Sequence, residues 1–508
     1  MTVDTKSFFE NDFSASLFPL KTNQLMMRHH AADLEAHVAR VVSSASQDRD
    51  FNFLAQTKTH AAKPRNHLRR TAVLDPVATY FVYDFVFRNQ GSFTGVVKPE
   101  RKAFGYQFEG SVPIPVHKAF QDFSNAVASA KLRYVHFLSF DIASYFNSLY
   151  HHDLAHWLLS VEGLPSSDAD AMARFLREAN SGRSIDCLPQ GVYPTKMIGS
   201  AFLGFVEANG QLRCAQTYRF MDDIYLFDDD EQVLIKDFLL LQKLLGQFAL
   251  NVNPTKTSYD GSTSSVESAF SEIQAQLDSI IDEEERPAVY FGSGVEVDWG
   301  DEENDEDDPD ESSRGLTAEQ TGRLFNLLLD PRAEEADVER ILSVLLEDTD
   351  TLVEAVPVLF KRFPNIVKQL HRLFGLIEDK EALAEGLLEM LAAGDIHLLE
   401  YQLFWAAVIA EDHLSTTKHF GPIVIRLFEL TGEYEIARAK VLEIPDQRFG
   451  LREIRDSILK SGASNWLAWS SAMGTRSLPK AARNHMLKYF AKGSAINQLI
   501  ADCVSNLP

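Results

Sequence analysis

Three aspartates are the residues of this 508-residue chain whose type and spacing best suit chemistry. Asp222 and Asp223 are adjacent, between two aromatic-rich arms, and Asp141 lies about 80 residues earlier, directly after an apolar run. Mg²⁺ prefers carboxylate oxygens, and three carboxylates on neighbouring strands could hold two such ions for an in-line phosphoryl transfer. The Asp-Asp pair alone is equally well explained by a solvent-exposed turn, so both interpretations stand at this point.

The pattern around the aspartates predicts the elements that must position them. Residues 135–140 are mostly apolar and predict a buried strand, at whose end a carboxylate needs a partner or a metal. The two arms of 218–227 predict a hairpin with Asp222 and Asp223 at its tip. Between these elements, Pro189 and Gly191 mark a loop before a buried helix, and Gln190 at its entrance could line a groove for a sugar or base.

Basic residues occur where a phosphate could be bound. Arg69 and Arg70 precede a short predicted strand at 72–74, and a guanidinium presents a fork of donors to phosphate oxygens. Lys256 follows the hairpin and a predicted helix at 231–248. A solvated surface is the alternative interpretation of each of these cations.

The charge is distributed unevenly along the chain. The net charge is −24, but residues 1–260 hold 26 basic and 28 acidic residues, and residues 51–140 hold 12 basic and 5 acidic ones. A basic stretch of this kind is compatible with a phosphate-facing surface, although a solvated face explains it equally well. Three scattered cysteines indicate a reducing compartment, and because residues 1–10 are charged and no apolar run reaches about 20 residues, we expect neither a signal peptide nor a membrane span.

The second half of the chain predicts a different architecture. Residues 301–311 carry nine acids in eleven positions, which is typical of a solvated linker, with a helix at about 265–283 before it. From residue 316 onward, successive amphipathic helices separated by turn signals predict a HEAT-like helical repeat or an irregular bundle. The predicted domains are therefore 1–262, 263–315 and 316–508, and the fold class is α+β followed by an all-α domain.

The order of these motifs over about residues 60–260 resembles the palm and fingers of reverse transcriptases. FDIASYFNSL at 140–149 resembles motif A, LPQG at 188–191 motif B, FMDD at 220–223 motif C and LNVNPTKT at 250–257 motif D. Two departures are Phe220 in place of the usual tyrosine and VYPTKM after Gly191. No thumb, maturase or RNase H-like region follows residue 260.

The resemblance implies roles for individual residues. Asp141, Asp222 and Asp223 would bind two Mg²⁺ ions, with Mn²⁺ as an alternative, and the Ile142 carbonyl would complete one metal site. Phe146 would be the steric gate that selects deoxynucleotides, and Gln190 would line the nucleotide pocket. Lys256 would face the pyrophosphate as a general acid. Arg69 and Arg70 would be the finger arginines for the triphosphate.

A palm followed by helical repeats resembles the abortive-infection (Abi) reverse transcriptases of bacterial phage defence, more closely the prophage-borne members. The resemblance implies untemplated, protein-primed DNA synthesis from dNTPs in the bacterial cytoplasm by a homo-oligomer. The single-stranded DNA product would stay covalently attached to the protein. The N-terminal region has no tyrosine before Tyr80, so the priming residue is a later tyrosine, a serine or threonine, or a tyrosine altered to Phe8, Phe9 or Phe13.

Two other functions remain compatible with the sequence. One is a conventional RNA-templated reverse transcriptase with an accessory helical domain, which would depend strictly on a template. The other is a non-catalytic interaction scaffold in which the palm is a relic, against which the complete set of three carboxylates argues.

Overall fold

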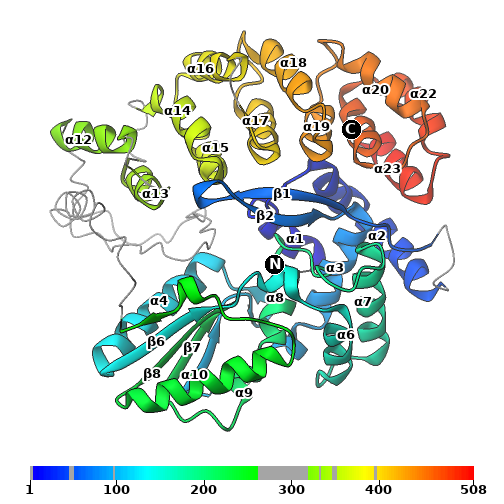
Figure 1. The fold of residues 1–508 in the computed structure, drawn as a ribbon. Helices are drawn as coiled ribbons and strands as arrows, with labels where there is room; N and C mark the ends of the chain where they lie inside the picture. Colours follow the sequence, from blue (N-terminus) through cyan, green and yellow to red (C-terminus); the bar gives the residue numbers. More distant parts are fainter. Residues whose placement is uncertain are drawn as a thin grey trace. The chain divides into compact units, whose positions relative to one another are not determined.

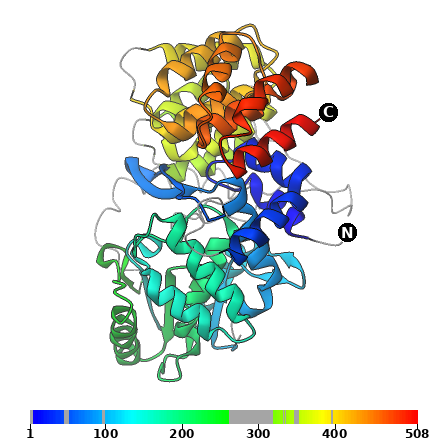
Figure 2. The same cartoon turned by 90° about the vertical axis from the view of Figure 1, so that its right-hand side faces the viewer.

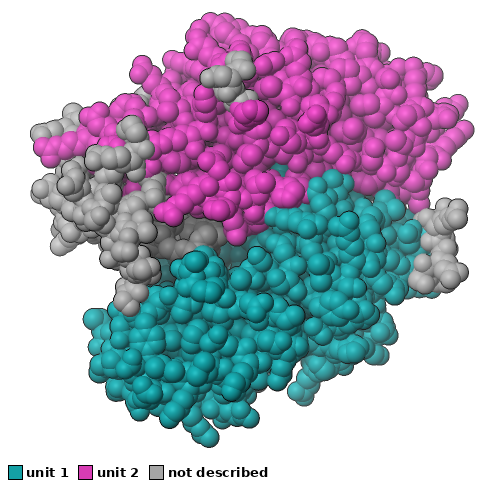
Figure 3. Space-filling view, in the orientation of Figure 1, with its two compact units in different colours: residues 1–58, 70–264, 296–301 teal, residues 59–69, 265–295, 302–508 magenta. Residues whose placement is uncertain are grey.

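The computed structural model describes residues 4–44, 51–94, 98–260, 318–330, 333, 335–345, 352–393 and 397–507. The chain forms two compact units, which are coloured separately in Figure 3. The first comprises residues 1–58, 70–264 and 296–301, and the second residues 59–69, 265–295 and 302–508. The helix predicted at 265–283 and the acidic run at 301–311 lie outside the described residues, so the predicted boundaries at 262 and 315 stay predictions.

The first unit combines helices with a mixed sheet (Figure 1). Its elements begin with α1 (Thr5–Phe13), α2 (Lys21–Ser43), α3 (Pro76–Arg88), β3 (Arg101–Phe104), β4 (Phe108–Glu109), β5 (Val112–Pro113), α4 (Val116–Arg133) and β6 (His136–Asp141). They continue with α5 (Tyr145–Ser148), α6 (His151–Ser160), α7 (Ser166–Ala179), α8 (Tyr193–Phe202), α9 (Phe205–Ala208), β7 (Gln216–Phe220), β8 (Asp223–Asp228), α10 (Glu231–Gly246) and β9 (Ser258–Tyr259). The hairpin of β1 (Thr57–Lys63) and β2 (His67–Val73) starts and ends in this unit, while residues 59–69 group with the second unit.

A five-stranded sheet in the order β3-β7-β8-β6-β9 is the centre of the first unit. The predicted hairpin is confirmed, because β7 and β8 pair in antiparallel fashion with Phe220 opposite Asp223. The strand predicted at 135–140 is also confirmed as β6, which pairs with the other side of β8. β6 and β8 are therefore direct neighbours, although about 80 residues separate them in the chain.

Helices cover both faces of this sheet. Phe123 of α4 makes edge contacts with Tyr225 and a tilted contact with Phe220, with ring centroids 5.7 and 5.6 Å apart. Phe238 of α10 packs on Phe140 of β6 with centroids 5.0 Å apart. Since successive side chains of a strand point to opposite faces, and Phe140 lies opposite Ile224 rather than Tyr225, α4 and α10 cover opposite faces.

The N-terminal segment docks on the core of the first unit through aromatic side chains. Asp4 caps α1 by accepting from the Ser7 backbone N–H, and helix α1 then buries Phe8 and Phe9. The Phe8 ring contacts Tyr83 of α3 and Tyr193 of α8, with centroids 5.1 and 5.5 Å apart. These rings fix the N-terminal helix to α3 and to α8, the helix that follows the LPQG loop.

The described elements of the second unit after residue 317 are helices. They are α12 (Ala318–Leu329), α13 (Glu335–Val344), α14 (Ala355–Arg362), α15 (Val367–Leu376), α16 (Lys380–Ala392), α17 (Glu400–His413), α18 (Phe420–Leu430), α19 (Glu435–Glu443), α20 (Leu451–Lys460), α21 (Trp466–Gly474), α22 (Lys480–Phe490) and α23 (Ala495–Asn506). The sequence-based prediction of an all-α region is confirmed.

Many helices of the second unit pack against the next but one in sequence. α15 packs on α17, α17 on α19, α19 on α21 and α21 on α23, while α14 packs on α16 and α16 on α18 (Figures 1 and 2). This i to i+2 packing produces two layers of helices, as in a helical repeat array. The buried Lys440 in this array is neutralised by Glu411 and Glu443 at 2.7 and 2.8 Å, which satisfies the requirement that a buried charge be paired.

Candidate active site

Asp141, Asp222 and Asp223 meet at one end of the sheet. Asp223 is the first residue of β8 and lies directly opposite Asp141, the last residue of β6. Residues that face each other across antiparallel strands have Cβ atoms about 5 Å apart. Asp222 lies in the hairpin turn, where its carbonyl accepts a hydrogen bond from the Ile142 N–H at 3.3 Å. The predicted proximity of the three aspartates is therefore present in the structure, while their catalytic role stays a prediction.

The carboxylates of Asp141 and Asp222 interact directly. Burial, followed by the negative charge of Asp141, raises the pKa of Asp222 to about 7. Asp141 is itself buried, and Lys256 Nζ lies 3.3 Å from its Oδ2. Lys256 thus contacts the site through an aspartate, and more than half of its side chain is exposed. The arrangement concentrates negative charge, which Lys256 beside Asp141 and the buried Arg219 near Asp222 partly offset.

The loop after α10 holds Asp141 from the other side. The Asn253 N–H donates to the Asp141 carbonyl at 2.7 Å, and Asn253 Nδ2 lies 3.3 Å from Asp141 Oδ2. Ile142 forms an isolated bridge with Val252, and the Ala143 N–H donates to the Asn251 carbonyl at 2.8 Å. The segment that resembles motif D therefore pairs with the end of β6, and its backbone fixes the Asp141 main chain.

The chemistry of this donor set fits a divalent cation. Carboxylate oxygens are the preferred ligands of Mg²⁺ and Mn²⁺. Burial and the Asp141 charge raise the pKa of Asp222 to about 7, and a cation between the two carboxylates would stabilise their ionised forms. Over the described part of the chain, no three His, Cys, Asp or Glu side chains are already grouped as metal ligands. Asp141 and Asp222 are accordingly the first candidates to hold the ion, with Asp223 opposite Asp141 as the third.

Phe146 lies five residues after Asp141, on the short helix α5. Its ring packs against Gly199 of α8, where an added Cβ would lie 3.1 Å from the ring, and 5% of the residue is exposed. The neighbouring Tyr145 hydroxyl donates to the Gly199 carbonyl at 2.6 Å. Helix α8 thus supports both aromatic residues that follow Asp141, which fixes the place of the predicted steric gate.

The N-terminal segment contacts the loop that contains Gln190. Asp12 of this segment accepts a hydrogen bond from the N–H of Tyr193, two residues after the loop, at 2.8 Å, while the hydroxyl of Thr71 on β2 donates to the Gln190 carbonyl. Gly191 has a φ of +113°, and a Cβ there would lie 2.8 Å from Leu17. Asp12 and Leu17 of the N-terminal segment therefore help to hold this loop, a contact that no local sequence pattern predicts.

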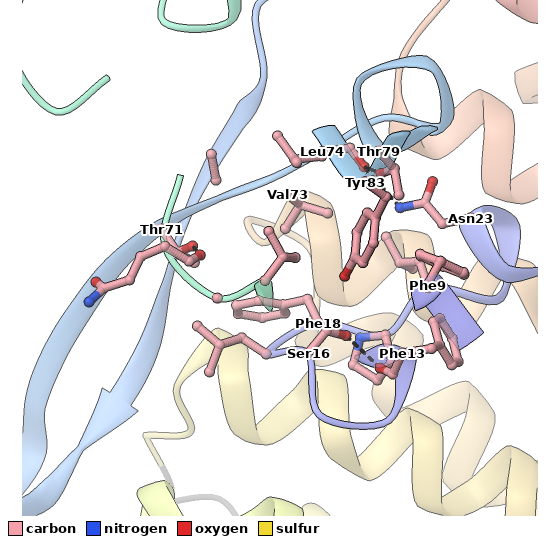
Figure 4. Close-up of a pocket in the computed structure, with 17 residues that line it drawn as sticks. Phe9, Phe13, Ser16, Phe18, Asn23, Thr71, Val73, Leu74, Thr79 and Tyr83 are labelled. Atoms are coloured by element: carbon pink, nitrogen blue, oxygen red, sulfur yellow. Dashed lines mark hydrogen bonds between the residues drawn. The ribbon is translucent and has the colours of Figure 1, made fainter. Parts of the chain in front are cut away.

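A cavity of about 40 Å³ lies behind this loop. Phe9, Phe13 and Phe18 line it from the N-terminal segment, and Val73 and Tyr83 line it from the opposite side (Figure 4). The Tyr83 hydroxyl donates to Asp12, and burial followed by this carboxylate raises the pKa of Tyr83. The lining is largely apolar, which is compatible with a packing space between the segment and the core.

Arg70 of the predicted triphosphate-binding pair contacts an acid. Its Nε lies 3.1 Å from Asp186 Oδ2, and Lys58 Nζ lies 3.3 Å from the same oxygen. Asn147, next to Phe146, donates from Nδ2 to Asp186 Oδ1 at 2.7 Å. Arg69 is the preceding residue of β2, and because side chains alternate along a strand, it faces the other way. The two predicted finger arginines are thus not brought together on one face.

Four residues around the site had no predicted role. Asp186 and Lys58 come from separate loop and strand positions without a local signal, and Asn253 entered only as part of the LNVNPTKT segment. Arg219 was missed although a signal exists, because a charged residue inside an apolar strand must find a buried partner. That partner is Glu207, whose carboxylate Arg219 Nε and Nη2 contact at 2.7 and 2.8 Å.

No protein-family model and no curated protein matches this chain. Solved structures with local similarity include telomerase from Candida albicans in complex with a fragment of telomeric RNA, at 10% identity and a TM-score of 0.29, with 82% of this chain and 66% of that chain covered. They also include apo telomerase from Candida tropicalis, at 9% identity and a TM-score of 0.32, with 93% and 74% covered. The chain thus spans about two thirds of the length of the first of these structures.

None of the helices that the structure describes is both long and apolar enough to span a membrane.

Proposed function

We propose that this chain is a two-metal-ion DNA polymerase that resembles the Abi reverse transcriptases. The observation that carries the proposal is the meeting of Asp141, Asp222 and Asp223 at one end of the sheet, where burial and like charge raise the pKa of Asp222 to about 7. Burying carboxylates close together lowers the stability of the fold unless a cation offsets their charge. A purely structural role therefore does not explain why these three aspartates meet.

The residues around the cluster would have different roles in the reaction. Mg²⁺ bound to the aspartates would stabilise the attacking and leaving oxygens of a nucleotidyl transfer. Asp141 and Asp222 would hold the site, Lys256 would supply a proton or positive charge beside Asp141, and Asn253 would orient the Asp141 carboxylate. The aromatic ring of Phe146, supported by Gly199, would exclude a 2′-hydroxyl and so favour dNTPs.

We further propose that the protein is a homo-oligomer that synthesises DNA without a template and primes this synthesis on one of its own side chains. Its role would be abortive-infection phage defence. This part of the proposal rests on the resemblance of the motifs and on a helical region in the place of a thumb. Phe8 and Phe9 are two of the positions at which a priming tyrosine could have been altered, and they are at most 4% exposed. A tyrosine at either position would be buried, so we place the priming hydroxyl elsewhere.

The test of the proposal is an incorporation assay. Purified protein is incubated with Mg²⁺ and labelled dNTPs, with and without an RNA template, and run on a denaturing gel before and after protease digestion. Labelled DNA that forms without a template supports untemplated synthesis. If this DNA migrates as free DNA only after protease digestion, it was attached to the protein, which supports protein priming. Strict template dependence would instead support the conventional reverse transcriptase, and a free product would exclude covalent priming.

A variant assigns the activity to the aspartates. Asp222→Asn keeps the size of the side chain but removes its charge, so incorporation should fall by at least about 100-fold. Asp229→Asn is the matched control at the other end of the same hairpin, where Asp229 accepts from the Val135 N–H at 3.0 Å. Full incorporation or undiminished phage defence with Asp222→Asn would leave the scaffold interpretation as the better one.

A further inference from the structure

An ion pair is buried directly beneath the turn that carries Asp222. Arg219 and Glu207 are 1% and 7% exposed, and they form two parallel hydrogen bonds of 2.7 and 2.8 Å. Arg219 comes from β7, two residues before the turn, and Glu207 from the short helix α9. A bidentate guanidinium–carboxylate contact fixes distance and orientation together, which a single hydrogen bond does not.

The remaining donor of Arg219 reaches the turn itself. Nη1 donates to the carbonyl of Met221 at 2.9 Å and lies 3.4 Å from the hydroxyl oxygen of Ser200 on α8. Met221 has a φ of +54°, in the left-handed region that a residue with a side chain adopts at a free-energy cost. Arg219 therefore holds the strained residue that immediately precedes Asp222, and Glu207 and Ser200 hold Arg219.

The same network reaches the segment after Asp141. The Gly199 carbonyl, next to Ser200, accepts a hydrogen bond from the Tyr145 hydroxyl at 2.6 Å. Helix α8 consequently connects the residues that follow Asp141 with the guanidinium that holds the Asp222 turn. A buried ion pair contributes little to stability compared with apolar packing, so its geometry calls for a further explanation.

We propose that Arg219, held by Glu207, is a positioning residue that fixes the Met221–Asp222 turn and thereby sets the Asp222 carboxylate against that of Asp141. The proposal deepens the proposed function, on which its metal-binding part rests. Arg219 acts through the backbone and touches no reacting atom. Its removal should loosen the turn and weaken cation binding at the aspartates, while the fold of the first unit is kept.

The variants separate positioning from stability. Arg219→Met/Glu207→Leu removes both charges, so no unpaired charge stays buried and the protein should fold. Arg219→Lys keeps the charge but loses the bidentate contact. Arg101→Met is the matched control, because Arg101 is also buried, on the adjacent strand β3, and holds the Cys214 carbonyl at 2.6 Å before the start of β7. All are compared in the full-length chain.

The first measurement is amide hydrogen exchange at residues 220–224, which does not depend on metal or activity. The double variant should exchange at least about tenfold faster at this turn than the wild type, with Arg219→Lys between the two. Arg101→Met should leave the turn unchanged. Equal exchange in the wild type and the double variant would overturn the proposal.

The second measurement is Mn²⁺ binding, followed by the paramagnetic resonance signal of the free ion. The double variant should bind about 10- to 100-fold more weakly, the usual loss when a residue that orients metal ligands is removed. In the incorporation assay, kcat should fall by a similar factor while KM for dNTP stays within about threefold. A double variant with wild-type Mn²⁺ affinity and kcat would show that the pair is only structural and would also overturn the proposal.

The two proposals fail in different ways. If the wild type binds no Mn²⁺, or if Asp222→Asn binds it equally well, the proposed metal site is wrong. The exchange measurement then still decides whether Arg219 positions the turn. If Asp222→Asn abolishes Mn²⁺ binding but the double variant does not weaken it, the metal site stands and the positioning role of Arg219 is wrong.

Discussion

Asp141 and Asp222 have different surroundings although they share one site. Asp141 is contacted by Lys256 and Asn253, both from the loop after α10. Asp222 is held through the backbone, and burial and the Asp141 charge raise its pKa to about 7. A cation that binds both carboxylates would therefore compete with Lys256 for Asp141. We therefore expect the Lys256 side chain to move away from Asp141 when a cation is bound.

The aromatic ring of Phe146 yields a prediction about the choice of sugar. Phe146→Ala removes the ring that packs on Gly199, so space opens for a 2′-hydroxyl. The ratio of kcat/KM for dNTP to that for rNTP should fall by about 10- to 100-fold, since an apolar surface rejects an added hydroxyl by roughly this factor. Single-nucleotide incorporation with matched dNTP and rNTP measures it.

A control variant on the adjacent strand tests whether the effect is specific. Phe137→Ala removes a ring of similar size from β6, where Phe137 contacts Phe227 with centroids 6.1 Å apart. Its ratio of dNTP to rNTP use should equal that of the wild type. An unchanged ratio in Phe146→Ala would remove Phe146 from the role of steric gate.

The secondary-structure elements around the site were largely predictable. The apolar run at 135–140 identified β6, the aromatic-rich arms around Asp222 and Asp223 identified the β7–β8 hairpin, and the loop and apolar run at 188–205 identified α8. Their pairing could not be derived from local patterns, because the neighbour of β6 is a strand about 80 residues away. The contact of Leu17 with Gly191 is equally non-local, and only the glycine hinted at a close approach.

This contact predicts that Gly191→Ala will destabilise the first unit. The φ of +113° is strained for alanine, and the new Cβ would meet Leu17 at 2.8 Å, so the free energy of unfolding should fall by about 1–3 kcal/mol or more. Gly182→Ala is the control, because Gly182 also has a positive φ of +75° but nothing lies within 4 Å of its Cβ position. Urea unfolding measures both variants, and equal losses would contradict the role of Leu17.

In the second unit, two packed helices bring histidines together. His371 of α15 and His413 of α17 have ring centroids 4.6 Å apart, and Asp412 lies 3.1 Å from His371 Nε2. Burial, followed by the charge of His371, lowers the pKa of His413 to about 4. Lys380 lowers it further, while Asp412 opposes the shift.

The lowered pKa predicts that acid destabilises the second unit. Between pH 6.5, the usual histidine pKa, and pH 4, the unfolded chain binds a proton at His413 that the folded chain does not. Stability is therefore complete above about pH 6.5 and is lost as the pH falls toward 4. The full shift corresponds to about 3 kcal/mol, which partial exposure of the group reduces to about 1–2 kcal/mol.

Denaturant unfolding at pH 7, 5.5 and 4.5 measures this dependence. His413→Gln should flatten it by about 1 kcal/mol over this range. The exposed His485 of α22 provides the control variant His485→Gln, which should retain the wild-type dependence. If His413→Gln and the wild type lose stability in parallel, the acid sensitivity arises elsewhere.

The complete chain combines two units of different composition. The three aspartates and the all-α region could be predicted, because strand ends, turns and amphipathic helices have local sequence signals. The grouping of residues 59–69 with the helical unit could not, since it depends on side-chain contacts such as the Thr59 hydroxyl with Glu400 at 2.6 Å. The contact of Lys58 and Arg70 with Asp186 could not be predicted either, because it joins a hairpin to a loop more than 100 residues away in the sequence.

The uneven charge predicts where DNA binds. The chain carries a net charge of −24, yet residues 51–140 have an excess of seven basic residues, from 12 basic and 5 acidic ones. Lys102 of β3, together with Lys118 and Arg133 of α4, is exposed. If these three side chains contact phosphates, Lys102→Gln/Lys118→Gln/Arg133→Gln should weaken binding of single-stranded DNA. It should also reduce the slope of log affinity against log salt by about 2, or roughly 0.7 for each contact.

Fluorescence anisotropy of labelled single-stranded DNA at several salt concentrations measures this slope. Lys236→Gln/Lys243→Gln is the control, because both lysines are exposed on α10, which covers the opposite face of the sheet from α4. The control should keep the wild-type slope if DNA lies along α4. A loss of slope in the control but not in the triple variant would place the DNA on the α10 face, and no loss in either would show that charge on neither face contributes to binding.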